Sequence, residues 1–434
     1  MNTITVNQSI IESESDGHAD LVPADIQQLR RLVEEVVSNV PVVDLHTHLF
    51  ARQFGELNLW GIDEMLTYHY LVAELFRFSK TTPAEFWKLE KGAQGDLIWR
   101  ELFVRNTPLS EAARGVIYVL DALGLDTQAK TLDEARDFFA SQDPDAYVDR
   151  VLKISKVSDV VMTNDPLDTA EVEVWDAGRQ LDPRFHAALR LDRLLNGWAD
   201  AVPLIKGQGY KVSVELDDLC VAEARRFLDD WVTKMNPLYI GASLPDDFGY
   251  PEIGPRGVLL DRVILPTCRE QNLSLALMIG VRRRVNPELK LAGDGVGRAE
   301  VSALARICSD NPEVKFLSTF LSRENQHELC VVARKFANLM PFGCWWFMNN
   351  TSIIAEITRE RLEMLGTSFV AQHSDARIFD QLIYKWSNSR RVIGEALGDS
   401  YVALWNDGRR VGRKEVERDV AKLFAENFRE WVRR

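Results

Sequence analysis

The residues best suited to chemistry are Asp44-Leu45-His46-Thr47-His48, which continue the apolar run Pro41–Val43. His46 and His48 are two positions apart on an expected strand, so both imidazoles point to one face and can approach one cation. They leave coordination positions for a carboxylate and for water. The alternative is that one histidine packs in the core while the other caps a loop. We favour the metal site because Asp44 precedes the pair and another aspartate follows the last expected strand.

That second aspartate is Asp375, which lies in Ser374-Asp375-Ala376-Arg377. The first and eighth strands of a closed barrel are neighbours, so Asp375 is the expected third ligand. Arg377 would be a charged arm for an anionic group of the substrate. A helix cap with a surface ion pair is the alternative for this segment. Its position after the last strand favours the ligand.

The elements that must position these residues are short apolar runs alternating with helical segments. Regular alternation of strand and helix predicts parallel pairing through crossover helices, and eight units close a (β/α)8 barrel of the TIM type. Active sites of such barrels lie at the carboxyl ends of the strands. The expected strands are Pro41–Leu45, Asp159–Met162, Ala187–Leu191, Val212–Leu216, Leu273–Ile279, Val314–Phe320, Pro341–Phe347 and Ser368–Ala371.

The chain is expected to form a single barrel domain over residues 23–434, after a disordered tail over residues 1–22. Pro23 suits the first turn of an opening helix. Helical periodicity over residues 50–156 predicts a helical insertion after the first strand. Within it, Thr82-Pro83-Ala84-Glu85 and Thr131-Leu132-Asp133-Glu134 both match capping boxes.

Two aromatic segments allow two interpretations each. Tyr68-His69-Tyr70-Leu71 in the insertion is either plain packing or part of a site, and Trp345-Trp346 is either a core pair or a pocket wall. Arg190, which follows the third expected strand, is a further candidate for binding an anion.

Composition narrows the class of partner. The formal net charge is −13, which disfavours nucleic acid, so a small molecule is the expected partner. The five cysteines contain no CxxC pair and are expected to be reduced. The N-terminus carries no secretory signal, and no stretch of eighteen apolar residues predicts a membrane span. We therefore expect a cytoplasmic enzyme, and the sequence is compatible with a homo-oligomer.

Several of these segments together resemble the uronate isomerase (glucuronate isomerase) family of the amidohydrolase superfamily. The resemblance runs from Val42 to Trp386 and rests on separate short motifs. They are Asp44-x-His46-x-His48, His69-Tyr70, Thr163-Asn164-Asp165-Pro166, Arg190-Leu191-Asp192, Gly343-Cys344-Trp345-Trp346-Phe347 and Ser374-Asp375-Ala376-Arg377.

The resemblance implies a distorted barrel with a helical insertion after its first strand. It implies the conversion of a hexuronate aldose to its ketose, of the glucuronate to fructuronate or galacturonate to tagaturonate type. His46, His48 and Asp375 would bind a divalent metal, with zinc the first expectation and manganese an alternative. The residues that would face the sugar acid are His69, Tyr70, Arg190 and Arg377.

Two positions depart from the family pattern. Met278-Ile279-Gly280 stands where the family has His-Ile-Gly on the fifth strand, and a thioether is a poor partner for a hard oxygen. Val214-Glu215 stands where the family carries Asp-His near the fourth strand. Arg283, in the cluster Arg282–Arg284, matches a family arginine and could hold a carboxylate, while a solvated loop is the alternative.

The expected reaction moves a proton from C2 to C1 of the sugar through an enediol. Asp375, or a water molecule that it holds, would move the carbon proton, while Tyr70 and His69 would handle oxygen protons. Arg190, Arg377, Arg283 and Trp345 would bind the substrate. The alternatives are a hydrolase or decarboxylase acting on a sugar-acid derivative, and a binding protein that keeps the barrel without turnover.

Overall fold

Seven parallel strands and one short antiparallel strand form the sheet of this protein, whose computed structural model describes residues 21–433. The order is β1-β2-β3-β4-β5-β7-β8, and β6 pairs with β5 in the antiparallel sense. The strands are β1 Val42–Thr47, β2 Val157–Asn164, β3 Phe185–Arg190, β4 Tyr239–Pro245, β5 Ser274–Arg282, β6 Gly295–Val296, β7 Phe316–Phe320 and β8 Leu339–Pro341.

The barrel closes through backbone hydrogen bonds outside the regular strands. Phe342 and Val370 form a parallel bridge beside β8. Further along, the Asp375 N–H donates to His46 O at 3.2 Å, and the His48 N–H donates to Ala376 O at 2.7 Å. The expected eighth strand is therefore reduced to a single bridge, and the segment after it lies against β1. The predicted α/β barrel class is confirmed.

The fourth strand was predicted in the wrong place. Val212–Leu216 forms no strand, because it lies in the loop before helix α12 (Asp218–Met235), where Val214 is 53% exposed. The strand is instead β4, whose apolar residues are buried between its neighbours β3 and β5. Glu215 therefore does not lie at the end of the fourth strand, where it was predicted.

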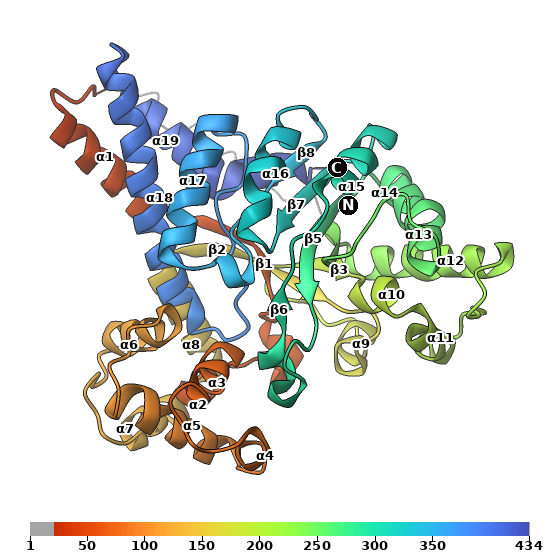
Figure 1. Ribbon diagram of the computed structural model, residues 1–434, viewed down its shortest axis with the longest axis horizontal. Coiled ribbons are helices and arrows are strands. Elements are labelled where there is room, and N and C mark those ends of the chain that lie inside the picture. The colour runs from red at the N-terminus through yellow and green to blue at the C-terminus, as the bar shows by residue number, and fades with distance from the viewer. Residues whose placement is uncertain (1–20, 434) are drawn as a thin grey trace.

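The helical insertion between β1 and β2 is confirmed and gathers at one end of the molecule (Figure 1). Thr82 and Glu85 form the predicted capping box. The second predicted box is wrong, because the Thr131 hydroxyl donates to the Asp133 carboxylate and Leu132 is the N-cap of α7. The inserted helices are α2 Ile62–Leu66, α3 His69–Leu75, α4 Pro83–Phe86, α5 Lys91–Trp99, α6 Glu111–Leu123, α7 Asp133–Ala140 and α8 Pro144–Ser155.

Helix α18 (Gln381–Asn406) joins the insertion to the rest of the fold. It contacts α1, α17, α6 and α8, and Figure 1 shows it rising from α6 and α8 at its lower end to run between α1 and α17. The other helices are α1 Ile26–Asn39, α9 Thr169–Asp176, α10 Asp192–Asn196, α11 Trp198–Gly207, α13 Pro255–Leu259, α14 Leu265–Gln271, α15 Val301–Asp310, α16 Gln326–Ala333, α17 Thr351–Leu365, α19 Arg413–Ala421 and α20 Asn427–Trp431.

The predicted N-terminal tail overlaps the described residues only at Leu21 and Val22. Residues 1–20 of the predicted tail lie outside the described residues, while Leu21 O accepts a hydrogen bond from the Arg413 N–H at 3.2 Å. The opening helix α1 begins at Ile26 and not at Pro23, because the Asp25 side chain caps the Gln28 N–H.

Three clusters of buried side chains stabilise the fold. One fills the barrel interior and includes Leu45, Tyr239 and Met278, and the other two lie between the sheet and its covering helices. The five cysteines are free and buried. Among the described residues, no helix combines the length and apolar character needed to cross a membrane.

Candidate active site

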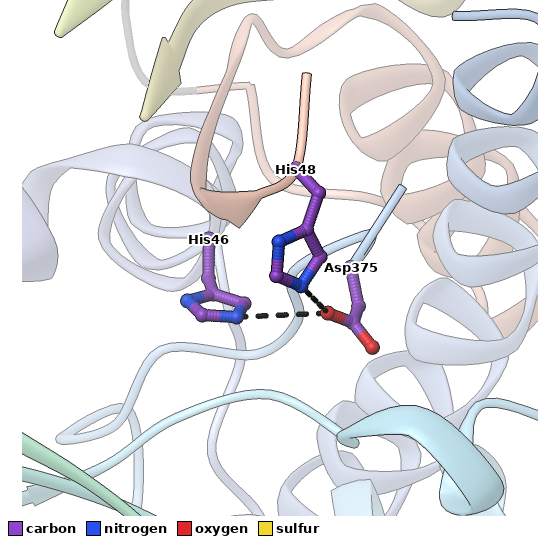
Figure 2. Close-up of side chains that lie close together, drawn as sticks. All are labelled: His46, His48 and Asp375. Carbon is purple, nitrogen blue, oxygen red and sulfur yellow. Dashed lines mark ion pairs between the residues drawn. The ribbon is translucent and has the colours of Figure 1, made fainter. Parts of the chain in front are cut away.

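His46, His48 and Asp375 converge on one point. The Nε2 atoms of His46 and His48 lie 3.6 and 3.5 Å from the same carboxylate oxygen, Oδ1 of Asp375. Figure 2 shows both rings directed at that oxygen. One ligand atom from each residue lies within 4.8 Å of the others, which is the spacing of donors around one cation. The predicted grouping of these three residues is thus present in the fold.

Two hydroxyl groups orient the histidine rings. Tyr239 Oη donates its hydrogen to Leu45 O at 2.8 Å, so it can only accept from His46 Nδ1, 3.2 Å away. Thr163 Oγ1 likewise donates to Thr47 O at 2.8 Å and accepts from His48 Nδ1 at 3.0 Å. Both Nδ1 atoms therefore carry the ring hydrogen, and both Nε2 lone pairs face Asp375.

The protonation of the rings also suits metal binding. Burial lowers the pKa of His46 to about 3 and holds the pKa of His48 well below its usual value, so both rings are neutral at pH 7. Asp375 Oδ1 is buried and has no hydrogen-bond partner among the described residues. A buried carboxylate oxygen without a donor is costly, and a cation would satisfy it. Two imidazole nitrogens and one carboxylate oxygen are a donor set that zinc accepts.

His69 presents a hydrogen-bond donor near this centre. Its Nε2 accepts from the indole N–H of Trp346 at 2.9 Å, so Nδ1 carries the hydrogen, and no described residue accepts it. Burial lowers the pKa of His69 to about 3. The negative charge of Asp375 opposes this shift, and the positive charge of Arg377 adds to it. Trp345, the predicted pocket residue, belongs to the interior cluster, while its neighbour Trp346 makes the contact with His69.

Tyr70 stands beside His69, with ring centroids 4.2 Å apart. Burial raises its pKa well above the usual value, and the negative charge of Asp375 adds to the shift. Tyr70 is therefore a neutral phenol at any physiological pH. It could donate a proton in a hydrogen bond without losing it.

The three predicted substrate arginines differ in their partners. Arg190 donates to Asp192 at 2.6 Å, and Arg283 donates to Asp294 at 2.5 Å. The guanidinium of Arg377 has no ion-pair partner within residues 21–433. Arg190 and Arg377 both act on the pKa of His48, which places their charges near the metal ligands. Arg283 lies 5.9 Å from the ring of Trp346.

The fifth strand offers no metal ligand. Met278 is 2% exposed and lies inside the barrel, opposite Thr319 on β7. Between Leu21 and Arg433, the set His46, His48 and Asp375 is the one group of three or more potential ligands close enough to share an ion. This arrangement suits one metal and not two.

The sequence pattern did not reveal two residues that support the site. Tyr239 was missed because β4 was predicted elsewhere, although the apolar run Tyr239–Leu244 was a usable signal. Lys385 is 3% exposed and points its ammonium at Ser374 O, 2.7 Å away. A lone lysine in a helix gives no sequence signal of such a contact.

Comparison with solved structures gives close matches. The uronate isomerase from Bacillus halodurans C-125 is similar over 94% of this chain and 97% of its own, with 50% identity and a TM-score of 0.92. The uronate isomerase from Thermotoga maritima shares 16% identity over 94% of this chain and 97% of its own, at a TM-score of 0.77. The glucuronate isomerase from Caulobacter crescentus shares 15% identity over 96% of both chains, at a TM-score of 0.73. These last two support the fold alone. No protein-family model and no curated protein matches the chain.

Proposed function

Because the chain belongs to the uronate isomerase family, we propose that it interconverts a hexuronate aldose and its ketose at the centre formed by His46, His48 and Asp375. The observation that carries this proposal is the convergence of the two Nε2 lone pairs on Asp375 Oδ1, with both ring tautomers set by Tyr239 and Thr163. The substrate would be of the glucuronate or galacturonate type.

The resident metal would be one divalent ion, for which we propose zinc, with manganese as the alternative. His46 and His48 would hold it through Nε2, and Asp375 through Oδ1. When bound, such an ion supplies a Lewis acid that stabilises negative charge on a carbonyl oxygen. Imidazole nitrogen favours zinc over the hard cations magnesium and calcium.

Asp375 would also carry the carbon proton. Its Oδ1 faces both histidine rings, so Oδ2 would be the oxygen left for the substrate. Asp375 would take the proton from C2 of the open-chain aldose, the electron pair of the C2–H bond would form the C1=C2 bond, and the C1=O π pair would move to O1, which gains a proton to give the enediol. Loss of the O2 proton would then form C2=O, the C1=C2 pair would take the proton back from Asp375 onto C1, and the proton released from O2 would balance the one that O1 gained, which gives the ketose.

His69 and Tyr70 would serve the sugar oxygens. His69 offers its Nδ1–H, and Tyr70 offers a neutral hydroxyl, so both donate hydrogen bonds to oxygens that gain negative charge in the enediol. Arg377, whose guanidinium is free of carboxylates in the described chain, would bind the substrate carboxylate, with Arg190 beside it. Arg283 and the indole ring of Trp345 would complete the pocket lining.

The reaction needs no membrane or nucleic-acid partner, and the barrel over residues 23–434 would act as one domain. The five free, buried cysteines support a reducing compartment, and we place the reaction in the cytoplasm.

The test is to incubate metal-replete protein with glucuronate or galacturonate in heavy water and to follow both sugars by NMR. Ketose formation is expected, with deuterium at C1 of the ketose or C2 of the recovered aldose where the carried proton exchanges with solvent. Asp375→Asn should abolish ketose formation while the barrel stays folded, because it removes a ligand and the proton carrier together. If neither hexuronate yields a ketose, yet a lactone or ester of such an acid is cleaved, the isomerase proposal is wrong.

A further inference from the structure

Asp375 adopts a backbone conformation that needs support. Its φ is +51°, in the left-handed region that residues other than glycine rarely occupy. Such a conformation costs free energy and persists only where the surroundings enforce it. The residue that precedes it, Ser374, is 1% exposed, so its backbone groups must find partners within the protein.

Both backbone groups of Ser374 are held by buried side chains. The Ser374 N–H donates to Asp44 Oδ1 at 2.9 Å. The Ser374 carbonyl accepts from Lys385 Nζ at 2.7 Å and from Asn349 Nδ2 at 3.2 Å. The Asp44 carboxylate is fixed in turn, because its Oδ2 accepts from the indole N–H of Trp386 at 2.8 Å.

The partners of Ser374 come from two places that matter for the metal centre. Asp44 lies on β1, the strand that carries His46 and His48, so it ties the third ligand's segment to the strand of the first two. Lys385 and Trp386 are consecutive residues of α18; Lys385 donates to the Ser374 carbonyl directly, while Trp386 acts on the Ser374 N–H through Asp44.

The buried lysine calls for an explanation. An ammonium group inside a protein costs free energy unless it is paired, and burial lowers the pKa of Lys385. Its ammonium donates to a carbonyl oxygen, and no carboxylate lies within ion-pair distance among residues 21–433. A charged donor gives a stronger hydrogen bond to that carbonyl than a neutral one would.

We propose that Lys385, Asp44 and Trp386 are positioning residues that clamp Ser374 and thereby hold Asp375 in place as metal ligand and proton carrier. This inference rests on the proposed metal site and adds to it the groups that set its third ligand. The clamp acts through both backbone groups of Ser374.

The test compares Lys385→Met and Trp386→Phe with Arg390→Met. Arg390 is a matched control, since it is also a buried cation on α18, and it donates to Val37 O at 2.8 Å and Val40 O at 2.7 Å without touching Ser374. Zinc affinity of each metal-free protein is measured by chelator competition, and unfolding is followed with and without zinc.

Lys385→Met should weaken zinc binding about 10- to 100-fold, the usual loss when a partner of a metal ligand is removed. Trp386→Phe should weaken it less, because Asp44 stays in place. Arg390→Met should lower the unfolding temperature yet bind zinc as the wild type does. At saturating zinc, Lys385→Met should also lower kcat and leave KM for the hexuronate unchanged.

Wild-type zinc affinity in both Lys385→Met and Trp386→Phe would overturn the clamp while leaving the metal site intact. Equal loss of zinc affinity in Arg390→Met would also overturn it, since the effect would then be general destabilisation. If His48→Ala binds zinc as tightly as the wild type, the metal site itself is wrong, which separates the failure of the proposed function from that of the clamp.

Discussion

The metal side and the sugar-acid side of the site are held by different kinds of contact. On the metal side, the ring nitrogens bond to hydroxyls that are themselves bonded to carbonyls of β1, and the Asp375 side chain is only 8% exposed. On the sugar-acid side, Arg190 and Arg283 are 27% and 50% exposed and pair with carboxylates. The contacts on the metal side fix a single geometry, whereas the arginines on the sugar-acid side can exchange one carboxylate partner for another.

This difference has a functional reason. Ligands of a metal must keep their geometry whether or not substrate is present. An arginine that binds a substrate carboxylate must give up any carboxylate it already holds, or start without one, as Arg377 does. Variants on the metal side should therefore change metal affinity and kcat, whereas variants on the other side should change KM.

The largest effect is expected from His48→Ala, which removes a ligand. Zinc binding should be lost and kcat/KM should fall by at least about 1000-fold, since a Lewis acid contributes several kcal/mol to the barrier. His327→Ala is the control, because His327 is an exposed histidine that pairs with Glu360 away from the site. Metal content and ketose formation are measured for both variants. Retained activity in His48→Ala would show that the reaction does not need this metal site.

Thr163→Val should have the next largest effect. The valine cannot accept the His48 Nδ1 hydrogen, so the ring loses the contact that sets its tautomer, and zinc affinity should fall about 10- to 100-fold. Thr163→Ser keeps the hydroxyl and should bind zinc nearly as the wild type does. Equal affinities in the valine and serine variants would show that the hydroxyl does not orient His48.

Arg377→Met should raise KM for the hexuronate about 10- to 100-fold, which corresponds to the loss of a charged hydrogen bond. Zinc affinity should stay unchanged, because Arg377 is not a ligand. Steady-state kinetics with zinc-saturated protein measure the change. A fall in kcat at constant KM would place Arg377 with the catalytic groups and not with the carboxylate-binding ones.

Arg283→Met should have the smallest effect, with KM raised about 5-fold or less, because an exposed ion pair contributes little. Arg283 is half exposed and already paired with Asp294. The same kinetic assay checks it. A KM change as large as that of Arg377→Met would mean that Arg283 releases Asp294 to bind the substrate, and the ranking of the arginines would be reversed.

The sequence predicted those features of the site that depend on the local spacing of residues and on closure of the barrel. His46 and His48 share a strand face because of their spacing, and Asp375 could be placed beside them because the barrel closes. Tyr239 was missed because the run Val212–Leu216 was also compatible with a strand, and only pairing with β3 and β5 identifies Tyr239–Leu244 as part of the fourth one. Lys385 was missed for another reason, because its partner Ser374 is brought near by the packing of α18.

One divalent ion is expected to bind to Nε2 of His46, Nε2 of His48 and Oδ1 of Asp375. Anomalous diffraction from zinc-loaded crystals tests it directly. One peak is expected, about 2.0–2.2 Å from each of these three atoms, with Tyr239 and Thr163 still bonded to the Nδ1 atoms. A zinc ion bound through either Nδ1 atom, or a zinc site without Asp375, would contradict this coordination.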